Sequence, residues 1–169
     1  MRITERLKAE HGVLLFQLRH LQDLVRLGAS LEVLKAVVDT IANADDRHSG
    51  MEARLLYPAL AIVVGPESPL LQRSKAAHEE LRRLRARIDA GVFDSSTVDA
   101  FAESLRDHLE REIHDVFAVV EDSLPAERLA AMSSWDVDHI HEVNARREGG
   151  TAPSSEACAE PTCRHEVTG

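Results

Sequence analysis

The chain has 169 residues, of which 44% are hydrophobic, and this is enough for one globular domain with its own core. Its 20 Lys and Arg residues against 29 Asp and Glu give a formal net charge of −9, and only 4% of the residues are aromatic. Nucleic acids and anionic membrane surfaces are therefore excluded as expected partners, because phosphates require clustered positive charge and bases require aromatic side chains for stacking.

Neither export nor membrane insertion is predicted. The opening residues 1–8 contain no apolar segment typical of a signal peptide. The longest apolar stretch covers residues 55–64 and contains Pro58, so it is far too short to span a bilayer as a helix. Cys158 and Cys163 stand near the end of the chain, where they cannot cross-link a core. We therefore expect a cytoplasmic protein in a reducing compartment.

The composition, together with the positions of Gly and Pro, predicts an all-α fold. Ala, Leu, Glu and Arg dominate, and period-two alternation of β-branched residues is nearly absent. The first helix is predicted over residues 4–27 and ends at Gly28, a favoured residue after a helix C-terminus. The second helix begins after Ser30 as N-cap and continues to residue 64, before Gly65 and Pro66.

Two further long helices and one shorter helix are predicted downstream. The third has Ser68 as N-cap and Pro69 in its first position, and it ends before Gly91. The fourth covers residues 95–122, and a less amphipathic fifth covers residues 126–147. Long helices with short loops predict an up-down-up-down four-helix bundle over residues 1–124, an additional C-terminal helix over residues 125–148 and a flexible tail over residues 149–169.

Six polar residues face the predicted core rather than solvent. On the second and fourth helices a histidine and a glutamate stand four residues apart, so both side chains point to the same side of the helix. The first and third helices each contribute a lone histidine, central in the apolar stripe on the first helix and at its edge on the third. In chain order these residues are His11, His48, Glu52, His78, His108 and Glu112.

Burial of the two glutamates requires compensation, because an ionised carboxylate without a partner is costly in a core. Protonation, a buried Arg or Lys, or a metal ion would each provide it. Arg47, Arg54 and Arg111 are close in sequence but point to other faces. A metal accounts for the whole pattern, since imidazole and carboxylate together suit iron, zinc or manganese.

The order of these residues is H, HxxxE, H, HxxxE, with one element on each of four helices. The segments 47–52 and 107–112 are similar to each other, and Tyr57 and Phe117 occupy matching positions after them. A two-fold pseudo-symmetric bundle would therefore bring all six side chains into one central layer.

This arrangement resembles the hemerythrin-like, or HHE cation-binding, family of non-haem di-iron four-helix bundles. The resemblance implies two iron ions bridged by Glu52 and Glu112. It also implies that His11 and His48 bind one iron and that His78 and His108 bind the other. The positive charge of two ferric ions, which two glutamates only partly neutralise, favours an oxide or hydroxide as a further bridge. The resemblance covers about residues 4–123 and depends on Glu10-His11, His48-Ser-Gly-Met-Glu52, Tyr57-Pro58, His78-Glu-Glu-Leu81 and His108-Leu-Glu-Arg-Glu112.

The chain departs from the oxygen-carrying members of that family. Those proteins have a second histidine one turn from the ligand on the third helix, where this chain has Ser74 and Arg82. They also place an Asp five residues after the histidine of the fourth helix, where this chain has Glu112 at four. We therefore expect reaction with hydrogen peroxide, nitric oxide or dioxygen rather than reversible oxygen carriage.

Several functions are compatible with such a centre. An oxidoreductase that consumes peroxide or nitric oxide, similar to a catalase or peroxidase, is the hypothesis that the missing histidine favours. An iron or oxygen sensor that binds without turnover is the alternative, and a metal-free structural bundle is a third interpretation. A ferritin-like site is disfavoured, because it needs Glu-x-x-His on two helices.

The other candidate residues are not predicted to be ligands of the site. Tyr57 faces away from His48 by helical phase, so we expect it to pack in the core, and a hydrogen bond near the site is the alternative. Trp135 is expected to anchor the fifth helix on the bundle. Cys158, Cys163 and His165 could form a metal or redox clamp, but their spacing is wider than in most zinc sites. The histidines that are expected away from the centre are His20, His114, His139 and His141.

Overall fold

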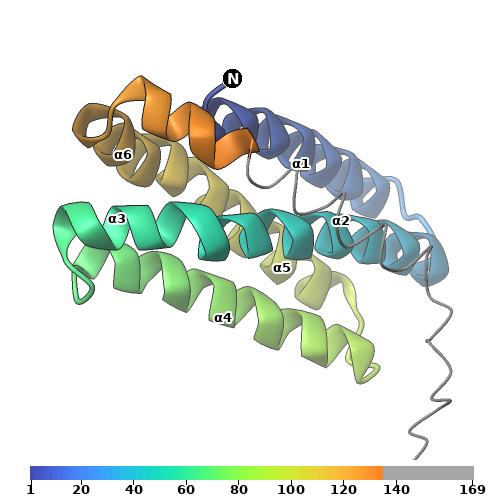
Figure 1. The fold of residues 1–169 in the computed structure, drawn as a ribbon. Helices are drawn as coiled ribbons and strands as arrows, with labels where there is room; N and C mark the ends of the chain where they lie inside the picture. Colours follow the sequence, from blue (N-terminus) through green and yellow to red (C-terminus); the bar gives the residue numbers. More distant parts are fainter. Residues whose placement is uncertain (135–169) are drawn as a thin grey trace, which may run out of the picture.

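The computed structural model describes residues 1–134, and every regular element in this part of the chain is helical. Figure 1 shows the long helices side by side as a bundle, which confirms the predicted all-α class. In chain order the elements are α1 (Ile3–Arg26), α2 (Leu31–Met51), η1 (Glu52–Leu56), α3 (Tyr57–Val64), α4 (Pro69–Asp89), α5 (Ser95–Arg111), η2 (Glu112–Val116) and α6 (Phe117–Ser123).

Two of the predicted long helices contain a π-helical turn. The elements α2, η1 and α3 follow one another without a gap and cover the predicted second helix, and α5, η2 and α6 cover the fourth in the same way. Each π turn begins at a glutamate of the predicted site, Glu52 in η1 and Glu112 in η2. Neither turn is predictable from the helical pattern, because the average α-helical period contains no signal for one extra residue.

Local sequence explains where the helices begin and end. Ser30 and Ser68 cap α2 and α4 by accepting hydrogen bonds from backbone N–H groups, and Asp94 caps α5 in the same way. After α1 the chain turns at Gly28, whose φ of 71° lies in the left-handed region that glycine adopts at little cost. The first four helices therefore begin and end within a residue or two of their predicted positions.

The buried apolar side chains form two clusters, one on each side of a polar layer. On α1, Leu7 belongs to the first cluster and Leu14 to the second, and His11 lies between them in the chain. The helices around these clusters are held by packing of α1 on α2 and α5, of α4 on α5, and of α3 on α6. Because apolar residues flank the polar layer, bulk water is excluded from it along the bundle axis.

A further helical segment begins at residue 126 and continues to residue 134, the last one described. Its Leu129 is buried in the same apolar cluster as Phe117 and Val120, so this segment docks onto the bundle. No helix within residues 1–134 combines the length and the apolar character needed to cross a membrane. The predictions for Trp135, His139, His141, Cys158, Cys163 and His165 concern positions outside the described residues.

Candidate metal centre

The six polar residues that the sequence singled out are all buried, and they lie together between the two apolar clusters. His11 and Glu52 have no exposed surface, and His78 is the most exposed of the six at 8%. The position of His78 at the edge of its apolar stripe therefore still carries the side chain into the interior.

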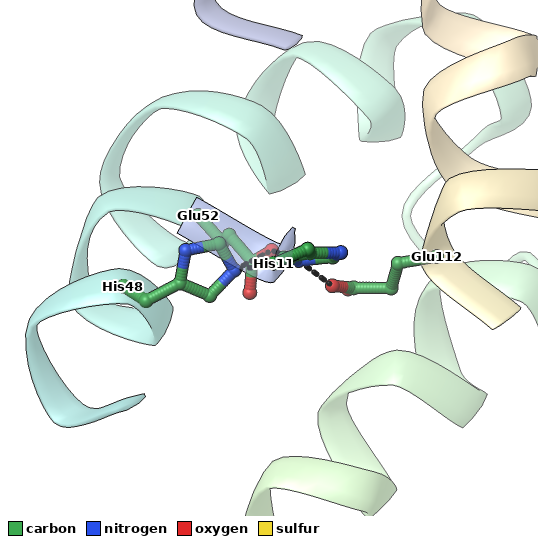
Figure 2. A group of neighbouring side chains, drawn as sticks. All are labelled: His11, His48, Glu52 and Glu112. Carbon is green, nitrogen blue, oxygen red and sulfur yellow. Dashed lines mark hydrogen bonds and ion pairs between the residues drawn. The ribbon is translucent and has the colours of Figure 1, made fainter. Parts of the chain in front are cut away.

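Four of these side chains converge on one point, as Figure 2 shows. His11, His48, Glu52 and Glu112 each offer one ligand atom, and these atoms all lie within 4.8 Å of one another. The Nε2 atoms of His11 and His48 are 2.8 Å apart, and His48 Nε2 is 2.9 Å from Glu52 Oε1. Glu112 Oε2 lies 3.6 Å from His11 Nε2. Two imidazoles and two carboxylates thus point their ligand atoms at one small volume.

A second group of four uses the same two carboxylates. Glu52, His78, His108 and Glu112 also offer ligand atoms that lie within 4.8 Å of one another. His78 Nε2 is 3.2 Å from Glu52 Oε2, and His108 Nε2 is 3.5 Å from Glu112 Oε2. Glu52 and Glu112 therefore stand between two pairs of histidines, one pair from α1 and α2 and the other from α4 and α5.

Tyr57 is part of this cluster, so the alternative of a hydrogen bond near the site is correct and the preferred prediction of core packing alone is not. Its hydroxyl donates a hydrogen bond of 2.8 Å to Glu112 Oε1 and lies 2.9 Å from His78 Nε2. The cause is η1, in which the N–H of Tyr57 bonds to the carbonyl of Glu52 five residues earlier. The extra residue in the π turn rotates α3 relative to α2. Tyr57 therefore lies one turn after Glu52, on the same side of the continuous helix that α2, η1 and α3 form.

Outside this cluster, Glu10 contacts His48. Glu10 Oε2 lies 2.9 Å from His48 Nδ1, and Glu10 Oε1 accepts a hydrogen bond of 3.2 Å from Arg6. Burial lowers the pKa of His48, but hydrogen bonds and charge from Glu10 and Glu52 outweigh it and raise this pKa to about 9. Such a carboxylate fixes which imidazole nitrogen carries the proton and leaves Nε2 free to bind a metal.

The pKa of His108 is shifted in the opposite direction from that of His48. Burial, together with the neighbouring histidines, lowers the pKa of His108 to about 3. Its imidazole is therefore neutral at pH 7, which is the form that binds metals. Among residues 1–134, its Nε2 atom has no hydrogen-bond partner.

The pKa values of the two glutamates are likewise shifted in opposite directions. Burial raises the pKa of Glu112 well above its usual range, and the charge of Glu52 raises it further. Burial also acts on Glu52, but hydrogen bonds from His11, His48 and His78 outweigh it and hold this pKa well below its usual range. The negative charge of Glu52 therefore opposes ionisation of Glu112.

Asp45 is a further buried acid near the site, and it is not among the six residues predicted from the sequence. It is 8% exposed, and among the described residues its Oδ1 atom has no hydrogen-bond partner. Burial raises its pKa to about 6, although the nearby His78 and His48 act in the opposite direction. Its position three residues before His48 puts it on the same helical face, so the spacing contained the signal. By contrast, His20 and His114 are exposed, as expected.

Comparison with known families identifies this arrangement. The model of the Hemerythrin HHE cation binding domain matches residues 2–120. The chain belongs to this hemerythrin family. The predicted resemblance is thus confirmed, whereas no curated protein and no solved structure matches the chain significantly.

The residues of this HHE domain fit metal ions. Among residues 1–134, Glu112 Oε2 and His108 Nε2 are fully buried without a hydrogen-bond partner. An unsatisfied buried polar atom costs about 1–3 kcal/mol, and more if it is charged. Cations beside these atoms would satisfy both and would stabilise the carboxylates of Glu52 and Glu112 in the ionised form. Ser74, four residues before His78 on α4, is also buried.

Proposed function

We propose that this hemerythrin-like domain is an up-down-up-down bundle that binds two iron ions. In this proposal His11 and His48 bind one ion and His78 and His108 bind the other, while Glu52 and Glu112 contact both. The observation that carries the proposal is that two groups of four ligand residues share the same two buried carboxylates. Six ligands are also more than one octahedral ion accepts while it keeps a position for a reactant.

We further propose that the centre reacts with hydrogen peroxide, nitric oxide or dioxygen. Bound iron supplies redox and Lewis-acid chemistry for such small ligands. The centre has fewer imidazoles than the oxygen carriers because Ser74 stands at the additional histidine position, and a serine leaves that position open to a reactant. The chemistry of the donors therefore favours turnover over stable oxygen binding.

The protein side chains around the centre have separate tasks. Glu10 holds the Nδ1 proton of His48, so that Nε2 faces the metal position. The Tyr57 hydroxyl holds its proton toward Glu112 Oε1 and keeps that carboxylate in place. Phe117 packs on the ring of His11 with 5.1 Å between ring centroids, which orients the imidazole and excludes water from this side.

Iron content and peroxide consumption test the proposal together. We expect about two iron ions per chain and catalytic loss of hydrogen peroxide or nitric oxide. His48→Ala and Glu112→Ala should lower iron content and melting temperature together, because binding at buried ligands is coupled to folding. His114→Ala is the matched control, since this histidine is exposed.

Three outcomes separate the alternatives. Full iron content with unchanged stability in both ligand variants would overturn the assignment of the site. Iron binding with a long-lived oxygen complex and no turnover would replace the proposed reaction with oxygen carriage or sensing. If the purified protein binds no metal at all, the remaining interpretation is a structural bundle without a metal centre.

A further inference from the structure

A pocket of about 350 Å³ between α2 and α4 connects the surface with the candidate metal centre. Its outer part is lined by exposed residues, among them Asp46 and Arg82, and its inner part by the buried His78. The volume is many times the ~30 Å³ that one water molecule occupies in the liquid. A small molecule can therefore reach the His78 side of the centre through this pocket.

Two polar atoms of the pocket residues are buried and unsatisfied. Asp45 Oδ1 is an acceptor and Arg85 Nη1 is a donor, and neither has a hydrogen-bond partner among residues 1–134. The other nitrogens of Arg85 are occupied, with Nη2 3.0 Å from Asp39 and Nε 3.0 Å from Asp89. Since buried polar atoms are normally paired, the pocket is suited to a molecule that both donates and accepts hydrogen bonds.

The fold does not require polar residues at these two places. The position 60 residues after Asp45, in the matching half of the bundle, is Leu105, and the position 67 residues before Arg85 is Leu18. Both leucines are fully buried and belong to one apolar cluster. The interface of α2 with α4 thus has a polar pocket where the matching interface of α5 with α1 has packed core.

We propose that this pocket is the entry and binding site for hydrogen peroxide, with Asp45 accepting a hydrogen bond from an O–H group and Arg85 donating one to a peroxide oxygen. The inference rests on the proposed function and selects among its three reactants. Nitric oxide and dioxygen have no hydrogen to donate, so they leave Asp45 Oδ1 unsatisfied. Hydrogen peroxide has two O–H donors and two acceptor oxygens, which match both orphan atoms.

Two variants and one control test this in the full-length, ferrous-loaded protein. Asp45→Asn removes the negative acceptor at nearly constant volume, and Ser49→Leu fills the pocket from α2. Asp99→Asn makes the same charge change at an exposed position on α5. The measurement is the stopped-flow rate of iron oxidation by hydrogen peroxide and, separately, by dioxygen, at equal iron content.

We expect Asp45→Asn to slow oxidation by peroxide about tenfold, because a neutral amide oxygen accepts a weaker hydrogen bond than a carboxylate, and to leave oxidation by dioxygen within about twofold. Ser49→Leu should slow both oxidants, because it blocks the entry itself, and Asp99→Asn should change neither. If wild-type protein loads iron but does not react with peroxide, the proposed function fails. If peroxide reacts equally fast with wild type, Asp45→Asn and Ser49→Leu, only the pocket proposal is overturned.

A second readout needs no iron and no turnover. Zinc has no redox chemistry, so zinc-loaded protein can be titrated with hydrogen peroxide while the backbone amides are followed by NMR. We expect shifts at Ser49 and Ala86, which line the pocket, and their loss in Asp45→Asn. Shifts of equal size in both proteins, or no shifts in the wild type, would overturn peroxide binding at this place.

Discussion

The two halves of the bundle place the same side chains at the same spacing, but they surround them differently. His48, Glu52 and the π turn η1 recur 60 residues later as His108, Glu112 and η2. The next matching position is Tyr57 in one half and Phe117 in the other. The ring centroids of Tyr57 and His78 are 5.6 Å apart, and those of Phe117 and His11 are 5.1 Å apart.

The environment of the histidines differs as well. His48 has the Glu10 carboxylate at its Nδ1 atom, whereas the residue that matches Glu10 before His78 is Ala77. The pKa of His48 is accordingly raised to about 9, and burial lowers that of His108 to about 3. The repeated backbone thus provides the geometry, and the residues that differ between the halves determine protonation and hydrogen bonding.

The largest expected effect comes from removing a carboxylate that both halves share. Glu112→Ala should reduce iron from about two ions per chain to less than one, because each ion loses a ligand. His108→Ala should lose iron on its own side only. Elemental analysis of purified protein measures both, and Glu110→Ala, at an exposed position, is the control. Equal iron in Glu112→Ala and wild type would contradict the bridging assignment.

Removal of Glu10 should selectively weaken metal binding by His11 and His48. Glu10→Ala deprives His48 Nδ1 of its acceptor, and loss of such a partner lowers metal affinity about 10- to 100-fold. Competition with a chelator measures this affinity. The reciprocal variant Ala77→Glu adds a carboxylate before His78 and serves as the comparison. An unchanged affinity in Glu10→Ala would show that His48 needs no partner.

Tyr57→Phe makes the two halves alike at this position. The variant leaves Glu112 Oε1 without its buried donor, and we expect the free energy of unfolding to fall by about 1–2 kcal/mol. Denaturant unfolding at constant metal loading measures it. Adding Phe117→Tyr should not restore stability, because that ring lies beside His11 and not beside His78. Full restoration would mean that the hydroxyl acts independently of its location.

The smallest effect concerns an ion pair between α1 and α6 that is not repeated at the matching positions of α4 and α3. Lys8 Nζ is 2.8 Å from Glu121 on α6, whereas the matching positions are Lys75 and Ala61, both of which line one pocket. Partial burial raises the pKa of Glu121, but hydrogen bonds from Lys8 and Thr4 outweigh it and lower this pKa below 4.5. Glu121→Gln should cost about 0.5 kcal/mol.

The sign of the pH dependence follows from this lowered pKa. The Glu121 carboxylate stabilises the folded state above its unfolded pKa, and this contribution disappears as the pH falls through the folded value. The difference between wild type and Glu121→Gln should therefore vanish in acid. Ala61→Glu should add a similar small gain near neutral pH. Thermal unfolding at several pH values measures both effects. A stability difference between wild type and Glu121→Gln that grows in acid would contradict the lowered pKa of Glu121.

Sequence alone was sufficient for the first four helices, their ends and the six clustered residues. Helix ends depend on local signals such as the Ser30 cap and Gly28, and the inward direction of His11 follows from its place in a periodic apolar stripe. The family resemblance depended on spacing, which the chain displays directly. The role of the six residues as iron ligands stays a prediction.

Tertiary structure decided the rest, because the decisive distances join residues far apart in the chain. The π turn at Glu52 changed the helical phase and brought Tyr57 to His78 and Glu112, 21 and 55 residues away in sequence. The partnership of Glu10 with His48 and the pocket that Asp45 and Arg85 line each exist only once separate helices pack. A helical period locates a side chain on its own helix, but only packing determines which groups from other helices it meets.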